Sequence, residues 1–79
     1  MFTVQLFNII DNEIPAGVVN GTNASFTLSI APNPPSSLSL RLNGVWLVQA
    51  RDYLLTGAAI TFVRIIPGVG DSVIGSYRH

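Results

Sequence analysis

Residues 38–46, Leu-Ser-Leu-Arg-Leu-Asn-Gly-Val-Trp, decide the fold class of this chain. Leucines occupy every second position of residues 38–42, and the residues between them are polar. This is the period of a strand with one buried face. Asn43-Gly44 then supplies two residues that tolerate positive φ, as a type I′ hairpin turn requires. Because a second apolar run follows the turn, the stretch predicts an antiparallel hairpin.

The same period of two continues on both sides of this hairpin. Apolar and β-branched runs separated by turn residues predict strands near residues 2–9, 14–20, 24–30, 37–43, 45–49, 59–65 and 72–78. No window has a helical pattern with capping residues. The sequence therefore predicts an all-β fold, a small antiparallel β-sandwich or partly open barrel of about six to seven short strands.

Two further turn signals shape this prediction. Asn20-Gly21 is a second hairpin signal of the same kind as Asn43-Gly44. Pro32-Asn33-Pro34-Pro35 cannot lie within a ladder, because proline has no N–H to donate. We expect that segment to be a loop or a crossover between two sheets.

The composition indicates a domain that completes its burial against other polypeptides. A single domain of 79 residues buries only about 60% of the surface that its unfolded chain exposes. Charged residues make up 10% of the chain, apolar residues 48%, and the formal net charge is zero. Cysteine is absent, so disulfides and thiolate metal sites cannot compensate for the small core. We therefore expect a homo-oligomer.

The same composition argues against several other classes of function. The arginines are scattered and matched by acids, so a phosphate backbone would find no basic cluster, and no uncharged apolar run is long enough for a membrane span. His79 is the single histidine, so no side-chain pair fits nucleophilic catalysis. We expect no enzyme activity, no cofactor, no metal site, no nucleic acid and no membrane.

An ordered set of short motifs resembles a small β-sandwich module of phage tail fibres, baseplate proteins and head-decorating proteins. The resemblance covers about residues 13 to 78 and rests on residues 17–23, Phe26-Thr27-Leu28, Leu38, Leu40 and Leu42 before Asn43-Gly44, Asp52-Tyr53 before Gly57, Ile60-Thr61-Phe62 before Pro67, Gly70-Asp71 and Tyr77-Arg78. It implies a β-sandwich domain over residues 13–79, with residues 1–12 outside it as an N-terminal arm or edge strand. Gly75 departs from the pattern, because a bulky strand residue is common there.

The motif residues have structural roles in this interpretation. Asn43 and Gly44 form the tight turn, and Gly57 takes positive φ. Asp52 accepts backbone N–H groups in a turn, and Tyr53 buries its ring while its hydroxyl finds a backbone partner. Gly70-Asp71 begins the last strand by the same turn logic.

The predicted partner interface consists of apolar residues in excess of what one thin core can hold. Its members are Phe2, Val4, Leu6, Phe7, Trp46, Ile65 and Ile66. Trp46 has three interpretations: packing between the sheets, an interface anchor, or a sugar-stacking platform flanked by Asn43, Gln49 or Arg51. The opening segment is our candidate for a strand that pairs with a neighbour.

The resemblance implies a non-enzymatic structural role. We expect a capsid decoration or cement protein that stabilises the head by binding neighbouring shell subunits, either the major capsid protein or another virion protein. Such a protein would assemble in the host cytoplasm, reside in the virion and form a homo-oligomer, with a trimer favoured. The alternative is a carbohydrate-binding adhesion module of a tail fibre or baseplate that binds a host glycan. A head–tail connector or tail-tube accessory is a third option.

Overall fold

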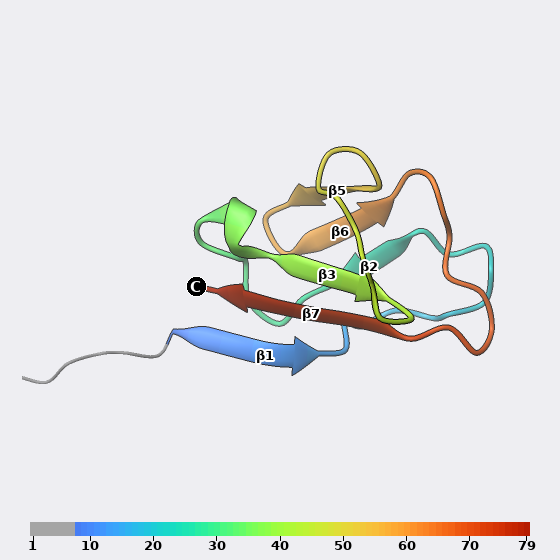
Figure 1. The fold of residues 1–79 in the computed structure, drawn as a ribbon, viewed down its shortest axis with the longest axis horizontal. Helices are drawn as coiled ribbons and strands as arrows, with labels where there is room; N and C mark the ends of the chain where they lie inside the picture. The colour runs from blue at the N-terminus through green and yellow to red at the C-terminus, as the bar shows by residue number, and fades with distance from the viewer. Residues whose placement is uncertain (1–7) are drawn as a thin grey trace, which may run out of the picture.

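The computed structural model describes residues 8–79, which form seven strands and one short 3-10 helix (Figure 1). The elements are β1 (Ile9–Glu13), β2 (Ser25–Thr27), η1 (Pro35–Ser37), β3 (Ser39–Leu42), β4 (Val45–Trp46), β5 (Tyr53–Thr56), β6 (Ala59–Phe62) and β7 (Val73–Arg78). All strand pairs between these elements are antiparallel. One sheet has the order β1-β7-β3-β4 and the other the order β2-β6-β5, which confirms the predicted all-β class.

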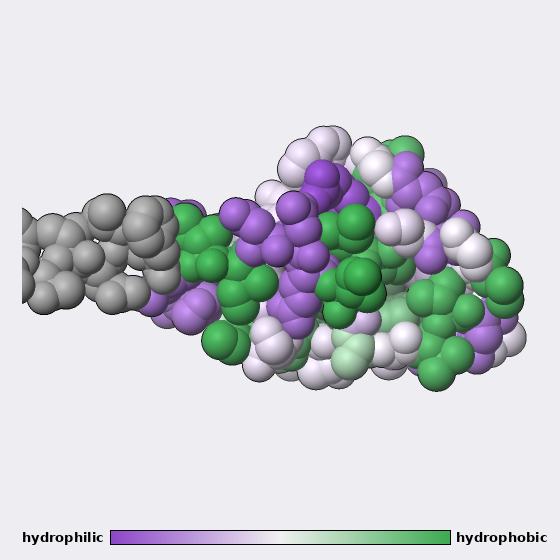
Figure 2. All heavy atoms as spheres, turned by 90° about the horizontal axis from the view of Figure 1, so that it is seen from below, coloured by the Kyte–Doolittle hydropathy of each residue, from purple (hydrophilic) through white to green (hydrophobic). Residues whose placement is uncertain are grey.

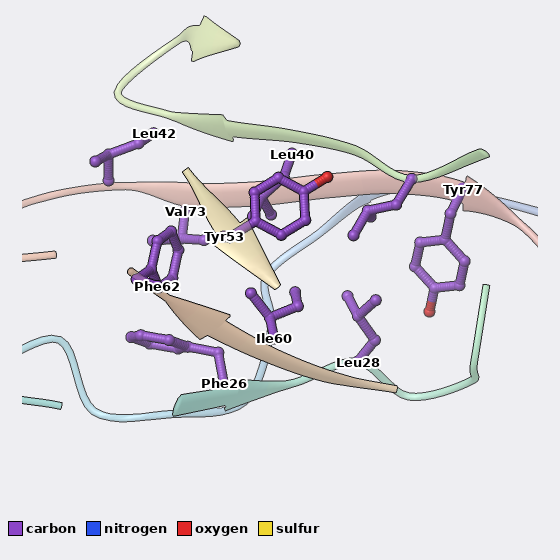
Figure 3. Close-up of a cluster of buried hydrophobic side chains, with 10 residues drawn as sticks. Phe26, Leu28, Leu40, Leu42, Tyr53, Ile60, Phe62, Val73 and Tyr77 are labelled. Carbon is purple, nitrogen blue, oxygen red and sulfur yellow. The ribbon is translucent and has the colours of Figure 1, made fainter. Parts of the chain in front are cut away.

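The core lies between the inner faces of the two sheets (Figure 3). Leu40 and Leu42 point inward from β3 because they are two residues apart, and Ile60 and Phe62 do the same from β6. The Phe26 and Phe62 rings pack edge to face, with centroids 5.4 Å apart. The buried hydrophobic side chains are Phe26, Leu28, Leu38, Leu40, Leu42, Tyr53, Ile60, Phe62, Val73 and Tyr77.

The hairpin of β3 and β4 has the turn predicted from the sequence. Asn43 has a φ of 53° and Gly44 a φ of 80°, the left-handed values that a type I′ turn requires. As a result, Leu42 pairs with Val45, and Arg41 pairs with Trp46. The turn therefore fixes which residue lies beside Trp46 on the sheet.

The proline segment was expected to be a loop or a crossover between two sheets, and it is a crossover. It leads from β2 in the three-stranded sheet to β3 in the four-stranded sheet, with a cis peptide bond between Asn33 and Pro34.

Further along the chain, Gly75 occupies a core-facing position in β7. A Cβ there would lie 3.3 Å from Leu38 Cδ1 and 3.5 Å from Leu40 Cδ1. Leu38 and Leu40, from the neighbouring strand β3 and the residue before it, thus fill the space that a bulkier residue would take.

Residues 14–20 were predicted as a strand, and the structure shows none there. Only Ala16 forms an isolated bridge, to Thr27. The Asn20 side chain instead accepts hydrogen bonds from the backbone N–H of Thr22 at 2.9 Å and of Asn23 at 2.9 Å. Such local side-chain bonds compete with a ladder, so the Asn20-Gly21 hairpin prediction is also wrong and the segment is a loop.

Other strand predictions differ from the structure in their limits. The strand β4 ends at Trp46, although Leu47 still donates its N–H to the Leu40 carbonyl at 2.9 Å. The chain leaves the ladder at Val48, which donates its N–H to the Asp52 carboxylate at 2.8 Å in a tight turn. The strand β5 was not predicted. At the start of the chain, β1 extends to Glu13, so it crosses the expected limit between residues 1–12 and 13–79 as the outer strand of its sheet.

Candidate interaction surface

Trp46 lies on the outer face of the four-stranded sheet, on the short edge strand β4. Its side chain is 63% exposed, which excludes packing between the sheets. Directly opposite on β3 is Arg41, whose guanidinium carbon is 5.4 Å from the centroid of the Trp46 ring. This is the geometry of a cation–π contact. The same guanidinium donates a hydrogen bond to Asn12 Oδ1 at 2.7 Å.

These contacts make a row of three side chains, Trp46, Arg41 and Asn12, which we call the Trp46 row. The row crosses the outer face of the sheet from β4 through β3 to β1. Among residues 8–79, Arg41 Nε is buried and has no hydrogen-bond partner. Arg41 thus contacts a neighbour on each side, the indole ring of Trp46 and the amide of Asn12. Trp and Arg in such a position are the residue types most often found as interface hot spots.

Two of the predicted flanks of a sugar platform, Asn43 and Gln49, make hydrogen bonds to other parts of the chain. The Asn43 amide donates to Asp71 Oδ1 at 2.9 Å, and its carbonyl accepts from the Ser72 N–H at 2.8 Å, so this side chain belongs to the turn. Gln49 donates to the Pro35 carbonyl at 3.4 Å. The polar side chain that lies over the Trp46 ring is Arg41, which in turn bonds to Asn12. The hairpin turn alone could have identified Arg41, since residues flanking a two-residue turn pair in order.

Ile65 and Ile66 lie in the connection between β6 and β7 and are 54% and 41% exposed. A hydrogen bond of 2.8 Å from the Gly21 N–H to the Pro67 carbonyl ties this connection to the loop after residue 14. The segment between β1 and β2 and the segment between β6 and β7 therefore lie at the same end of the molecule (Figure 1). Val18 belongs to the first segment and Val69 to the second, and both are exposed. We call Val18, Ile65, Ile66 and Val69 the loop-end residues.

Figure 2 shows that hydrophobic residues gather at several places on one face of the molecule, with polar residues between them. The other predicted interface residues, Phe2, Val4, Leu6 and Phe7, lie outside the described residues. The structure therefore places the predicted interface residues that it describes in two separate regions, the Trp46 row and the loop end.

Asp71 joins the hairpin turn to the start of β7. Its carboxylate accepts hydrogen bonds from the Asn43 amide at 2.9 Å and from the Gly68 N–H at 2.7 Å. These two bonds, the amide bond first, lower the pKa of Asp71 below its usual value. The preceding Gly70 has a φ of 91°. Both residues thus have the structural role expected of them.

Asp52 and Tyr53 have partly different surroundings from those predicted. Asp52 accepts the Val48 N–H, as expected of a turn aspartate, and lies 3.9 Å from Arg64 Nε. The Tyr53 ring is buried, and burial together with the nearby Asp52 charge raises the pKa of its hydroxyl. Within residues 8–79 this hydroxyl has no hydrogen bond, so the predicted backbone partner is wrong. Gly57 has the expected positive φ, at 57°.

The hydroxyl that does find partners belongs to Tyr77. It donates to the Glu13 carboxylate, and the same carboxylate accepts from the Ser29 N–H at 2.8 Å and from Ser29 Oγ at 3.1 Å. Burial, then the bond to Glu13, raises the pKa of Tyr77. Sequence reasoning missed this cluster, because Glu13 and Tyr77 are 64 positions apart and no local pattern connects them.

Two hollows in the described part of the chain are the remaining candidate sites. In residues 8–79 no three or more His, Cys, Asp or Glu side chains gather where a metal could bind. A hollow of about 330 Å³ beside β5 is lined by Pro35, Gln49, Ala50, Leu54, Leu55 and Thr56. A second, of about 210 Å³, is lined by Ile14, Pro15, Gly17, Val19, Phe26, Asp71, Ser72 and Val73. In the second hollow Ser72 follows Asp71, and the Asp71 carboxylate accepts its hydrogen bonds from the Asn43 amide and the Gly68 N–H.

Comparisons with family models, with curated proteins and with solved structures found no match to this chain. The described part of the chain, residues 8–79, contains no helix with the length and hydropathy of a membrane span. The functional argument therefore depends on the exposed surfaces themselves.

Proposed function

We propose that this chain is a non-enzymatic virion structural protein that decorates a phage capsid and stabilises the head by binding neighbouring shell subunits. The observation that supports this most directly is the distribution of large hydrophobic residues. Within residues 8–79, twelve of them are exposed, against ten in the buried core. Permanent interfaces are large and apolar, so a surface of this kind suits a protein whose working state is an assembly.

The two exposed regions supply the contacts in this proposal. Trp46, in contact with Arg41, inserts into the partner as an anchor, and Ile65 and Ile66 at the loop end bury further apolar area. The partner is the major capsid protein or another virion protein. The assignment to a phage particle, with assembly in the host cytoplasm and a trimer as the favoured state, comes from the sequence resemblance.

Binding to capsid shells tests the proposal. Purified protein is mixed with shells that lack it, the shells are sedimented, and the bound protein is quantified. Trp46→Ala should weaken binding by about 2 kcal/mol or more, roughly a 30-fold loss in affinity, because it removes an interface anchor. Thr61→Ala, a matched exposed position on the outer face of the other sheet, should bind as the wild type does. Equal binding of Trp46→Ala and wild type would remove the basis of the proposal.

Carbohydrate adhesion remains the second candidate, because Trp46 is exposed next to a hydrogen-bond donor. Sugars stack on aromatic rings and hydrogen-bond to flanking polar groups, and the Arg41 guanidinium lies over this ring. A glycan array probed with the intact oligomer separates the two functions. A specific glycan signal that is lost in Trp46→Ala, together with absent shell binding, would replace decoration by adhesion.

A further inference from the structure

The two sheets end in four edge strands, and three of these edges are protected against further pairing. The edge of β1 has a register shift between Ile10 and Glu13, with Asn12 in a left-handed conformation at a φ of 56°, and it includes two acidic residues. The edge strand β4 is only two residues long. Short length, bulges and charge are the usual means of blocking edge pairing.

The outer side of β2 is also covered. Ala16 exchanges two hydrogen bonds with Thr27, at 2.8 Å and 2.9 Å, and so occupies the edge of this three-residue strand. The fourth edge, β5, has no comparable protection. The residues Tyr53–Thr56 contain no charge, no proline and no register shift. Only the first of them is covered, by a 2.7 Å hydrogen bond from the Ala50 N–H to the Tyr53 carbonyl.

The register of the β5–β6 hairpin shows which backbone groups face this open edge. Thr56 pairs with Ala59 across the two-residue turn, and Leu54 pairs with Thr61. In an antiparallel ladder, residues alternate between hydrogen bonding to the partner strand and facing away from it. The N–H and carbonyl of Leu55 therefore face away from β6, and within residues 8–79 no other backbone group pairs with them.

A hollow of about 330 Å³ lies along the same edge. All of its lining residues are uncharged, and they include Leu54, whose side chain is 48% exposed. The opposite wall is held by the hydrogen bond of Gln49 to the Pro35 carbonyl. An added strand would thus find backbone partners at Leu55 and an uncharged space for alternate side chains.

We propose that this edge, which we call the β5 groove, binds residues 1–7 of a second copy of this chain as an added strand. The segment Met-Phe-Thr-Val-Gln-Leu-Phe has no charged side chain, so none would be left unpaired in the uncharged groove. Phe2, Val4 and Leu6 alternate with Thr3 and Gln5, which gives an extended segment one apolar face. Seven residues extend about 23 Å as a strand, enough to cover a four-residue edge.

The position of the donor segment in the fold favours binding to another copy. Residues 1–7 lead into β1, which belongs to the four-stranded sheet, whereas β5 is the edge of the other sheet. Figure 1 shows the two strands on opposite sides of the molecule. A segment from one side that binds a groove on the other side makes a head-to-tail contact, which closes into a ring where the rotation between copies permits it and otherwise forms an open filament. The expected trimer would be such a ring.

The inference rests on the proposed function only because both require the chain to assemble with other proteins. The contacts with the shell were assigned to Trp46, Ile65 and Ile66, which are not part of the β5 groove. Two variants separate donor from acceptor in the full-length chain. Val4→Asp with Leu6→Asp charges the apolar face of the donor segment. Leu54→Asp places a charge in the groove, and Thr61→Asp is its matched control, because Thr61 is the direct cross-strand partner of Leu54 but one strand further from the edge.

The test is the molar mass in solution, measured by light scattering or sedimentation. Wild type and Thr61→Asp should be oligomers of equal mass, and each charged variant alone should be a monomer, a threefold fall in mass for a trimer. An equimolar mixture of the two charged variants should form a pair and nothing larger, because it contains one intact donor and one intact groove. Circular dichroism checks that each variant retains the strand signal of the wild type.

Two results would overturn the inference. One is a wild-type protein that is monomeric at the concentrations used, and the other is a donor variant that keeps the wild-type mass. The donor variant decides the matter even if Leu54→Asp fails to fold, since its substitutions lie in a segment outside the described fold. Shell binding by a monomeric protein would contradict the β5 groove alone, whereas an oligomer of the expected kind that ignores shells would contradict the capsid role alone.

Discussion

At the scale of single residues, Gly17 leaves the least room for a Cβ among the glycines of residues 8–79. A Cβ at this position would overlap the ring of Phe26, with Cε2 of that ring only 2.8 Å away. Phe26 cannot move aside, since it is 1% exposed and packs against Phe62. We predict that Gly17→Ala lowers the free energy of unfolding by about 1–3 kcal/mol, the usual cost of overpacking a core.

Urea denaturation of Gly17→Ala measures this change, with Gly68→Ala as the control glycine. A Cβ at Gly68 would make an ordinary contact of 3.7 Å with the Asp71 carboxylate, so its effect should stay within about 0.5 kcal/mol. If the two variants had the same urea midpoint, the approach of the loop to the Phe26 ring would be wrong.

A second residue-scale prediction concerns Asp71 and acid pH. The pKa of Asp71 in the folded chain lies below its usual value of 3.8, so the unfolded chain binds more protons below about pH 4. The stability that this carboxylate contributes is thus present above that pH and is lost as the pH falls. Asp71→Asn should make the free energy of unfolding less dependent on pH between about 4 and 2.

Asn43→Gly gives an independent test of the same bond. It removes the amide that contributes most to the lowered pKa of Asp71, while glycine still accepts the positive φ of the turn. This variant should flatten the acid profile in the same direction. Acid unfolding curves identical to wild type for both variants would mean that the turn is not tied to β7 through Asp71.

At the scale of secondary-structure elements, a strand with a strong period of two, such as β3, was predictable from the sequence, whereas a short strand between turn residues, such as β5, was not. Leu38, Leu40 and Leu42 alternate with polar residues, so the sequence identified β3 and its turn. The strand β5 escaped prediction because Asp52 and Gly57 were interpreted as turn residues, although the four positions between them form a strand. Turn signals mark where a ladder stops, and they do not show how short a strand can be.

The predicted strand over residues 14–20 failed for a different reason. Its valines and isoleucine have high β-propensity, but this propensity depends on a partner strand and a half-buried surface. Val18 is 65% exposed and Ile14 is 76% exposed, so neither packs in this way.

The contacts of the candidate surface were likewise predictable only where they depend on local sequence. The neighbour Arg41 followed from hairpin register, whereas Asn12 and the Glu13–Tyr77 bond depend on pairing across the whole chain.

The bond between Glu13 and Tyr77 leads to a prediction about the attachment of the edge strand. Tyr77→Phe removes the hydroxyl and leaves the ring in the core, so β1 loses a side-chain tie to β7 and Glu13 loses a donor. We expect a loss of about 1.5–3 kcal/mol in the free energy of unfolding, as for hydrogen bonds to charged groups. Hydrogen exchange should rise first in residues 9–13. Uniform exchange across both sheets would show that the bond does not hold this edge.

At the scale of the whole molecule, the two proposed contacts occupy different surfaces. The β5 groove is an edge of the three-stranded sheet, and the Trp46 row lies on the outer face of the four-stranded sheet. A protein that uses one surface to bind its own copies and another to bind the shell can form a ring and still bind the shell through its second surface. Such a division also explains why a thin core is accompanied by apolar residues on both sheets.

Trp46 is the single tryptophan of the chain, so its fluorescence reports on one of these surfaces alone. In the isolated chain its side chain is 63% exposed, and acrylamide should quench it efficiently. Assembly through the β5 groove leaves Trp46 in solvent, so wild-type oligomer and the monomeric Leu54→Asp variant should show the same quenching constant. Binding to a shell should lower that constant severalfold, because an anchor residue is removed from solvent. Protection of Trp46 in the free oligomer would instead place the contact between copies at the Trp46 row.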